Sequence, residues 1–208
     1  ETANLEYQSP DALARRIRGA EGARLAFLTE ELATHPDGLE VARQLVLEDG
    51  NRVTEGLQGL ERIGTPAGRE VIVDYLRSGP TPANRAAALR ALAELLEGDI
   101  TEAEESLVAT ALDSDDNFVL LAAIEAAMHS GKRAYVARGL DIAARRGLNA
   151  LESAAKALSE ADLDSDADLA AALDELLEQV QLERKHAVGH DWILTEAYLI
   201  RALRRSLG

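Results

Sequence analysis

The chain has 208 residues, of which 47% are hydrophobic, so it is long and apolar enough to bury a sizeable core. Its 37 acidic and 22 basic side chains give a formal net charge of −15, and aromatic residues make up 3%, which argues against a basic, aromatic surface for nucleic acid. Cysteine is absent, which excludes disulfides and thiol catalysis, and no apolar run approaches the roughly 18 residues of a membrane-spanning helix.

The first helix is expected near the N-terminus, over residues 9–19. Ser9 can cap it, Pro10 suits its first turn, and Leu13 with Ile17 would face inward. A polar first helix is typical of the cap of a repeat stack. Because the chain starts with glutamate, we expect a processed or trimmed N-terminus, which leaves cytoplasmic and exported, periplasmic locations both open.

Helix–turn–helix patterns then recur with a period of 32 residues. In the first helix of each pair the recurring positions are Leu25, Leu57, Leu89 and Leu121, and also Leu28, Leu60, Leu92 and Ile124. In the second helix they are Leu76, Val108 and Leu140, and also Leu39, Val71, Ala103 and Tyr135. A fixed period of this length, built from helical pairs, is typical of a solenoid.

The clearest pair occupies residues 51–79. Its first helix carries an inward stripe at Val53, Leu57, Leu60 and Ile63, and its second helix carries one at Val71, Ile72, Tyr75 and Leu76. Gly64 ends the first helix, and Thr65 with Pro66 begins the second. Later pairs repeat this pattern, with Thr101 and Glu104 as a capping box and with Phe118, Leu121, Ile124 and Met128 expected to face inward.

The fold expected from these patterns is all-α. We predict an α-solenoid, a right-handed superhelix of about five helical pairs in one domain, 1–208. The pairs are expected at about 20–50, 51–80, 82–114, 115–147 and 148–182, with capping helices at 9–19 and 190–207. The 32-residue register is lost after 148, and the last helix is expected to bury Ile193, Leu199, Ile200, Leu203 and Leu207.

The stretch GLQGLERIG-TP-AGREVIVDYL, within 51–79, resembles a HEAT-type repeat, especially the short variety of phycobilisome-lyase-like proteins. The resemblance implies a protein-binding scaffold whose second helices line the concave face of the stack. Enzymes with this fold are poor matches. One is a di-iron hydroxylase with His-Glu pairs, whereas the four histidines here precede Pro36, Ser130, Ala187 and Asp191. The DNA glycosylases have a basic, aromatic groove, and a lyase-like chaperone stays open because it has no local motif.

Two clusters in the sequence resemble metal sites. Asp162, Asp164, Asp166 and Asp168 alternate like the start of a calcium loop, but Ala167 and Leu173 replace the glycine and the bidentate glutamate that such a loop needs. Helix capping is the preferred interpretation of that cluster. Glu183, His186 and His190 share one helical face only if the helix passes through Gly189, so a turn is preferred there. We expect no metal and, in the absence of a glycine-rich phosphate loop, no cofactor.

The predicted binding face follows from the outward positions of the second helices. They are Glu70, Asp74, Arg77, Glu102, Ser106, Arg133, Arg138 and Asp141. Helix 132–146 also carries Lys132, Arg145 and Arg146, which suggests a basic spot on an acidic surface. The sequence therefore predicts a non-catalytic scaffold or adaptor for a protein or peptide that places a carboxylate near Arg138. The rival interpretations are a metal-dependent or lyase-like enzyme and a structural subunit of a larger assembly.

Overall fold

The computed structural model describes residues 9–48, 50–96, 100–161, 167–184 and 191–206, with side chains left out at 167–168, 183–184, 191–192 and 206. Every regular element in these ranges is an α-helix. The twelve described helices are α1 (Pro10–Arg18), α2 (Gly22–Glu31), α3 (Gly38–Glu48), α4 (Val53–Ile63), α5 (Pro66–Arg77), α6 (Pro82–Glu94), α7 (Glu102–Leu112), α8 (Asn117–His129), α9 (Arg133–Arg146), α10 (Leu148–Glu160), α11 (Ala167–Arg184) and α12 (Asp191–Ser206). None of the helices in the described ranges is long and apolar enough to cross a membrane.

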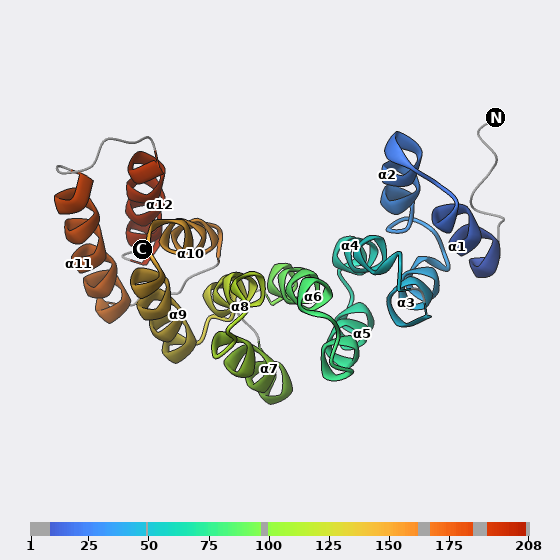
Figure 1. Ribbon diagram of the computed structural model, residues 1–208, viewed down its shortest axis with the longest axis horizontal. Coiled ribbons are helices and arrows are strands. Elements are labelled where there is room, and N and C mark those ends of the chain that lie inside the picture. Colours follow the sequence, from blue (N-terminus) through green and yellow to red (C-terminus); the bar gives the residue numbers. More distant parts are fainter. Residues whose placement is uncertain (1–8, 49, 97–99, 162–166, 185–190, 207–208) are drawn as a thin grey trace. The chain divides into compact units, whose positions relative to one another are not determined.

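The chain divides into two compact units, Glu1–Leu95 and Leu96–Gly208, and each is described by itself. In the first unit, α2, α4 and α6 form one layer, and α1, α3 and α5 form the other (Figure 1). Helix α4 is central because it packs against α2, α3, α5 and α6. The prediction of one continuous domain over both units stays a prediction.

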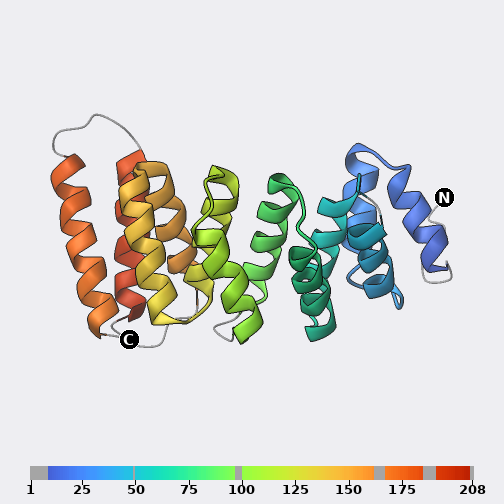
Figure 2. The same cartoon turned by 60° about the horizontal axis from the view of Figure 1, so that its bottom comes forward.

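The second unit is also built from two layers of helices. Helices α8, α10 and α12 lie side by side, and α7, α9 and α11 lie along them as the second layer (Figures 1 and 2). Helix α8 packs against α7, α9 and α10, whereas α11 packs mainly against α12. Helical pairs packed in two layers are consistent with a repeat-like, all-α protein.

The 32-residue spacing relates residues with the same degree of burial in three of the four predicted series, whereas in the fourth Leu57 and Leu89 are buried and Leu25 and Leu121 are half-buried. Leu28, Leu60, Leu92 and Ile124 are all buried, and so are Leu76, Val108 and Leu140. Leu39, Val71, Ala103 and Tyr135 are all half-buried. The hydrophobic register expected from the sequence is therefore confirmed for these positions.

The expected helix ends at Ser9, Gly64 and Thr65 are also confirmed. The backbone N–H of Ala12 donates to Ser9 Oγ at 3.4 Å, and that of Gly68 donates to Thr65 Oγ1 at 3.2 Å. Gly64 has φ 64°, a left-handed conformation that glycine adopts without steric cost. Because the chain reverses there, α5 can pack back against α4.

Arginine side chains attach the first and last helices to their neighbours. Arg52 donates to the carbonyl oxygens of Arg18 and Ala20 at 3.1 and 2.9 Å, just beyond the C-terminal end of α1. Arg205, on α12, donates to the Ala161 carbonyl oxygen at 2.7 Å, at the C-terminal end of α10. A cation is favourable at a helix C-terminus because the helix dipole is negative there.

The prediction that Phe118 and Ile193 face inward is wrong. Phe118 is 67% exposed, because it lies in the first turn of α8, and Ile193 is 45% exposed in the first turn of α12. Helix α8 has neighbours on several sides, so its buried residues surround it instead of forming one stripe. Small side chains such as Ala122 and Ala126 fill these additional contacts.

Helices α3 and α4 approach each other closely at a glycine. A Cβ atom at Gly56 would lie 2.7 Å from Val46 Cγ2 and 2.9 Å from the Ala42 carbonyl oxygen. These distances are shorter than ordinary van der Waals contact, and the second neighbour is rigid backbone. The absence of a side chain at Gly56 therefore allows α4 to pack against α3 at this distance.

Core truncations in the first unit should destabilise the protein strongly. Leu57 and Leu89 are 2% and 1% exposed, so Leu57→Ala and Leu89→Ala should each leave a cavity and lower the free energy of unfolding by about 2–5 kcal/mol. Asp74 is exposed, and Asp74→Ala should change stability by no more than about 0.5 kcal/mol. Urea denaturation measures the free energy of unfolding of the three variants. Equal destabilisation by all three substitutions would contradict the assigned register of buried and exposed positions.

The close contact between α3 and α4 leads to a second prediction, which concerns the stability of a Gly56→Ala variant. Gly56→Ala should cost about 1–3 kcal/mol from overpacking, which exceeds the gain of roughly 0.5–1 kcal/mol from better helix propensity. Gly50→Ala is the matched control, because a Cβ there meets nothing within 4 Å. A Gly56→Ala protein that is as stable as the Gly50→Ala protein in urea denaturation would rule out the close approach.

Glu61 has an unfavourable charge between α4 and α6. Burial raises the pKa of Glu61 above its ordinary value of 4.5, the Glu94 carboxylate raises it further, and Arg62 lowers it in part. The folded state therefore binds the Glu61 proton more tightly than the unfolded state. This stabilising contribution is complete below pH 4.5 and is lost as the pH rises through the raised pKa.

Neutralising this side chain should stabilise the protein near neutral pH. Glu61→Gln should be more stable than the wild-type protein at about pH 7, and the difference should shrink as the pH falls to about 4. Glu70→Gln, at an exposed position on α5, is the control and should show no such trend. Denaturant unfolding across this pH range measures the difference in unfolding free energy between Glu61→Gln and the wild type. A difference that grows towards low pH would show that the pKa of Glu61 is not raised.

Candidate functional site

The residues of the predicted binding face lie on α5, α7 and α9. They are Glu70, Asp74 and Arg77 on α5, Glu102 and Ser106 on α7, and Arg133, Arg138 and Asp141 on α9. Arg138 is half-buried, and the other seven are exposed. The α5 residues belong to the first unit, and the others belong to the second. A continuous surface across both units therefore stays a prediction, and the geometry below concerns the second unit alone.

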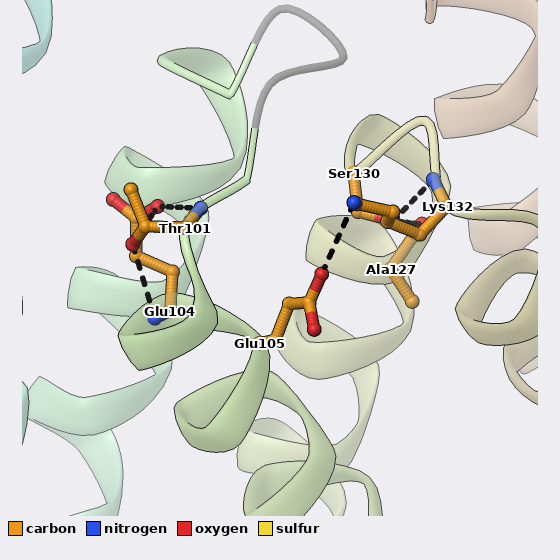
Figure 3. A network of polar contacts seen from close by, with 6 residues as sticks. All are labelled: Thr101, Glu104, Glu105, Ala127, Ser130 and Lys132. Atoms are coloured by element: carbon orange, nitrogen blue, oxygen red, sulfur yellow. Dashed lines mark hydrogen bonds and ion pairs between the residues drawn. The ribbon is translucent and has the colours of Figure 1, made fainter.

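Ion pairs connect α9 with α7. Arg138 donates to the carboxylate of Asp113, the residue that follows α7. Lys132 Nζ lies 3.4 Å from Glu105 Oε1, so the start of α9 is paired with α7 as well (Figure 3). The basic spot expected on this helix is therefore largely matched by local acids, and Arg145 pairs with Asp141 in the same way.

The beginning of α7 contains the expected capping box. Glu104 Oε2 accepts hydrogen bonds from the backbone N–H and the hydroxyl group of Thr101, at 2.8 and 2.7 Å (Figure 3). Glu104 is 2% exposed and occupies the repeat position that Ile72 and Val136 fill in the adjacent pairs. The three glutamates 102, 104 and 105 thus have different roles, since Glu104 acts in helix capping.

A polar pocket of about 510 Å³ lies between α9 and the turn after α7. It is lined by Leu112 at the end of α7, by Asp113, Ser114 and Asp115 from the turn, and by Arg138, Asp141, Ile142, Arg145 and Arg146 from α9. Its arginines already have acceptors, since Arg146 donates to Asn117 Oδ1 at 3.5 Å and the other two have carboxylates. The positive charges of this pocket are therefore already matched by local acceptors.

The other side of α9 faces α11 across a groove of about 460 Å³. Its apolar lining consists of Ala137, Leu140 and Ala144 from α9 and Leu169, Ala172 and Leu176 from α11. Its polar lining consists of Arg133, Asp141, Glu175 and Gln179. Pockets of roughly 300–1,000 Å³ with mostly apolar walls and a few polar groups are the usual form of a ligand site. We call this feature the α9–α11 groove.

One acidic side chain of α11, Glu175, lines the α9–α11 groove, and Asp174 and Glu178 lie elsewhere on the same helix. Asp174, Glu175 and Glu178 are all exposed, and none of them forms an ion pair within the described part of the chain. No lysine or arginine occurs between Leu169 and Leu182. The α11 side of the groove therefore has negative charge that no basic side chain of this segment balances.

The two metal candidates from the sequence lie outside the described residues or have side chains that are not described. They are the aspartates 162, 164, 166 and 168 and the group of Glu183, His186 and His190. Within the described ranges, no three His, Asp or Glu side chains are grouped to hold a metal. His35 has a structural contact, because its Nδ1 accepts a hydrogen bond from the Asp37 backbone N–H at 3.0 Å.

The structure divides the predicted α9 residues between two depressions. Arg138 lines the polar pocket, Arg133 lines the α9–α11 groove, and Asp141 lines both. The α11 half of the groove was not predicted, because the 32-residue register is lost before that helix. A usable signal was present in the alanines at outward positions of both helices, such as Ala144 and Ala172, which leave room for another chain.

Comparison with known proteins adds little to this geometry. No family model and no curated protein matches the chain. A crystal structure of an engineered protein from the Northeast Structural Genomics Consortium is similar, with 19% sequence identity, coverage of 95% of this chain and 96% of that chain, and a TM-score of 0.49. A likeness at this level supports no conclusion about function.

Proposed function

We propose that the protein is a non-catalytic scaffold or adaptor that binds a protein or peptide along its second helices. The single observation that supports this is the α9–α11 groove. It is open, it has an apolar floor that includes Leu140 and Leu169, and it has polar groups at its edges. Peptide-binding grooves between helices have this composition, because apolar contacts supply affinity and the polar rim supplies specificity.

We also propose that the two units form one HEAT-type solenoid. The 32-residue spacing, the two-layer packing within each unit and the resemblance of residues 51–79 to a HEAT-type repeat support this. In such a stack α5, α7 and α9 would lie along one face, so Asp74 of the first unit would be on the same face as Ser106 and Arg138.

A substitution that fills the groove tests the proposed function. Ala172 lines the groove, whereas Ala171 is exposed on the same helix and does not line it. We expect Ala172→Trp to reduce capture of at least one protein from a native lysate by about tenfold or more, because a blocked central contact typically costs 2 kcal/mol or more. Ala171→Trp should capture the same protein as well as the wild type does.

Quantitative mass spectrometry of the captured proteins gives the comparison, and circular dichroism checks that both variants remain helical. If every protein captured by the wild type is captured equally by Ala172→Trp, the groove is not the binding site and this proposal fails.

A further inference from the structure

The α9–α11 groove has the length of a short helix. Its lining residues extend from Arg133 to Ala144 on α9 and from Leu169 to Gln179 on α11. At 1.5 Å per residue these segments are each roughly 15–17 Å long, or about three helical turns. An occupant of about 11 residues in a helix would therefore be in contact with both walls along their whole length.

The small side chains of the walls favour a helical occupant. Ala137 and Ala144 on α9 and Ala172 on α11 are exposed alanines at the groove. Because alanine projects only a methyl group, another helix can approach closely, and its larger apolar side chains can reach Leu140 and Leu169 on the floor. An amphipathic helix in a groove makes this kind of contact through residues at i, i+3, i+4 and i+7.

The charges around the groove favour a basic occupant. Three basic side chains near α9 are already paired: Lys132 with Glu105, Arg138 with Asp113, and Arg145 with Asp141. On α11, Glu175 lines the groove and Glu178 follows it one turn later, and neither is paired within the described residues. Glu175 therefore brings an unpaired carboxylate into the groove itself, where a lysine or arginine of a partner would pair with it.

We infer that the α9–α11 groove binds a basic amphipathic helix of a partner protein. The apolar face of that helix packs on the groove floor, and its lysine or arginine residues face Glu175 and Glu178 on α11. Leu182, which is 58% exposed and two turns beyond Glu175 on the same side of α11, extends the apolar contact. The inference rests on the proposed function and adds the chemistry of the partner.

Three synthetic peptides of about 14 residues test the charge and the amphipathic pattern. The first has leucine at helical spacing and lysine elsewhere, the second replaces each lysine by glutamate, and the third has the composition of the first in an order without an apolar face. Fluorescence anisotropy at about 0.15 M salt, where long-range attraction is screened, measures their affinities for the full chain. The first peptide should bind at least about tenfold more tightly than the other two.

Matched variants locate the binding. Ala172→Trp and Glu175→Lys should each weaken the first peptide, by about tenfold and by several-fold, respectively. Ala26→Trp places the same ring at an exposed position of α2, in the other unit, and Glu160→Lys makes the same change in net charge at the exposed end of α10. Both controls should bind the first peptide as the wild type does.

The outcomes separate this inference from the proposed function. If the glutamate peptide binds as tightly as the lysine peptide and Ala172→Trp weakens it, the groove binds peptides but the basic partner is wrong. If Glu160→Lys weakens the lysine peptide as much as Glu175→Lys does, only overall charge is involved and the inference fails. If no peptide responds to Ala172→Trp, helix docking in the groove is also refuted.

Discussion

Each helix in this protein can bury only the surface that its neighbours cover, and this constraint determines both the core and the site. Helix α8 is covered by α7, α9 and α10, so it is buried on several sides and uses small residues such as Ala122 to fit. Helix α9 is covered by α8 and α10 on one side, and its ion pairs connect it to α7. Within the described part of the chain, the surface of α9 that faces α11 is left open, and the apolar groove results from this.

The repeat pattern identified most of the helices because equivalent positions in a stack have equivalent neighbours. Leu28 and Leu92 are buried for this reason, and Thr101 and Gly64 mark helix ends through local chemistry that the sequence displays directly. The same reasoning was wrong at Phe118. A stripe at helical spacing assumes one covered side, whereas the surroundings of α8 depend on three other helices that the local pattern does not describe.

The candidate site was predicted only in part. Arg133 and Asp141 of α9 are exposed and Arg138 is half-buried, but the sequence did not show that Asp113 would neutralise Arg138, because the two are 25 residues apart and meet only in the folded chain. Nor did it show that α11 would lie opposite α9, since α11 lies beyond the regular repeats and packs on α12. The carboxylate near Arg138 stays a prediction, and the pairing of Arg138 with Asp113 is the reason why the partner inferred for the α9–α11 groove is basic instead.

Hydrogen–deuterium exchange with and without the lysine-containing amphipathic peptide tests the central claim most directly. If a helix docks between α9 and α11, backbone amides of these two helices should exchange more slowly when the peptide is bound, because their local opening is suppressed. Amides of α5, in the other unit, should exchange at the same rate in both samples. Slower exchange in α5 without any change in α9 and α11 would contradict the assignment of the α9–α11 groove as the binding site.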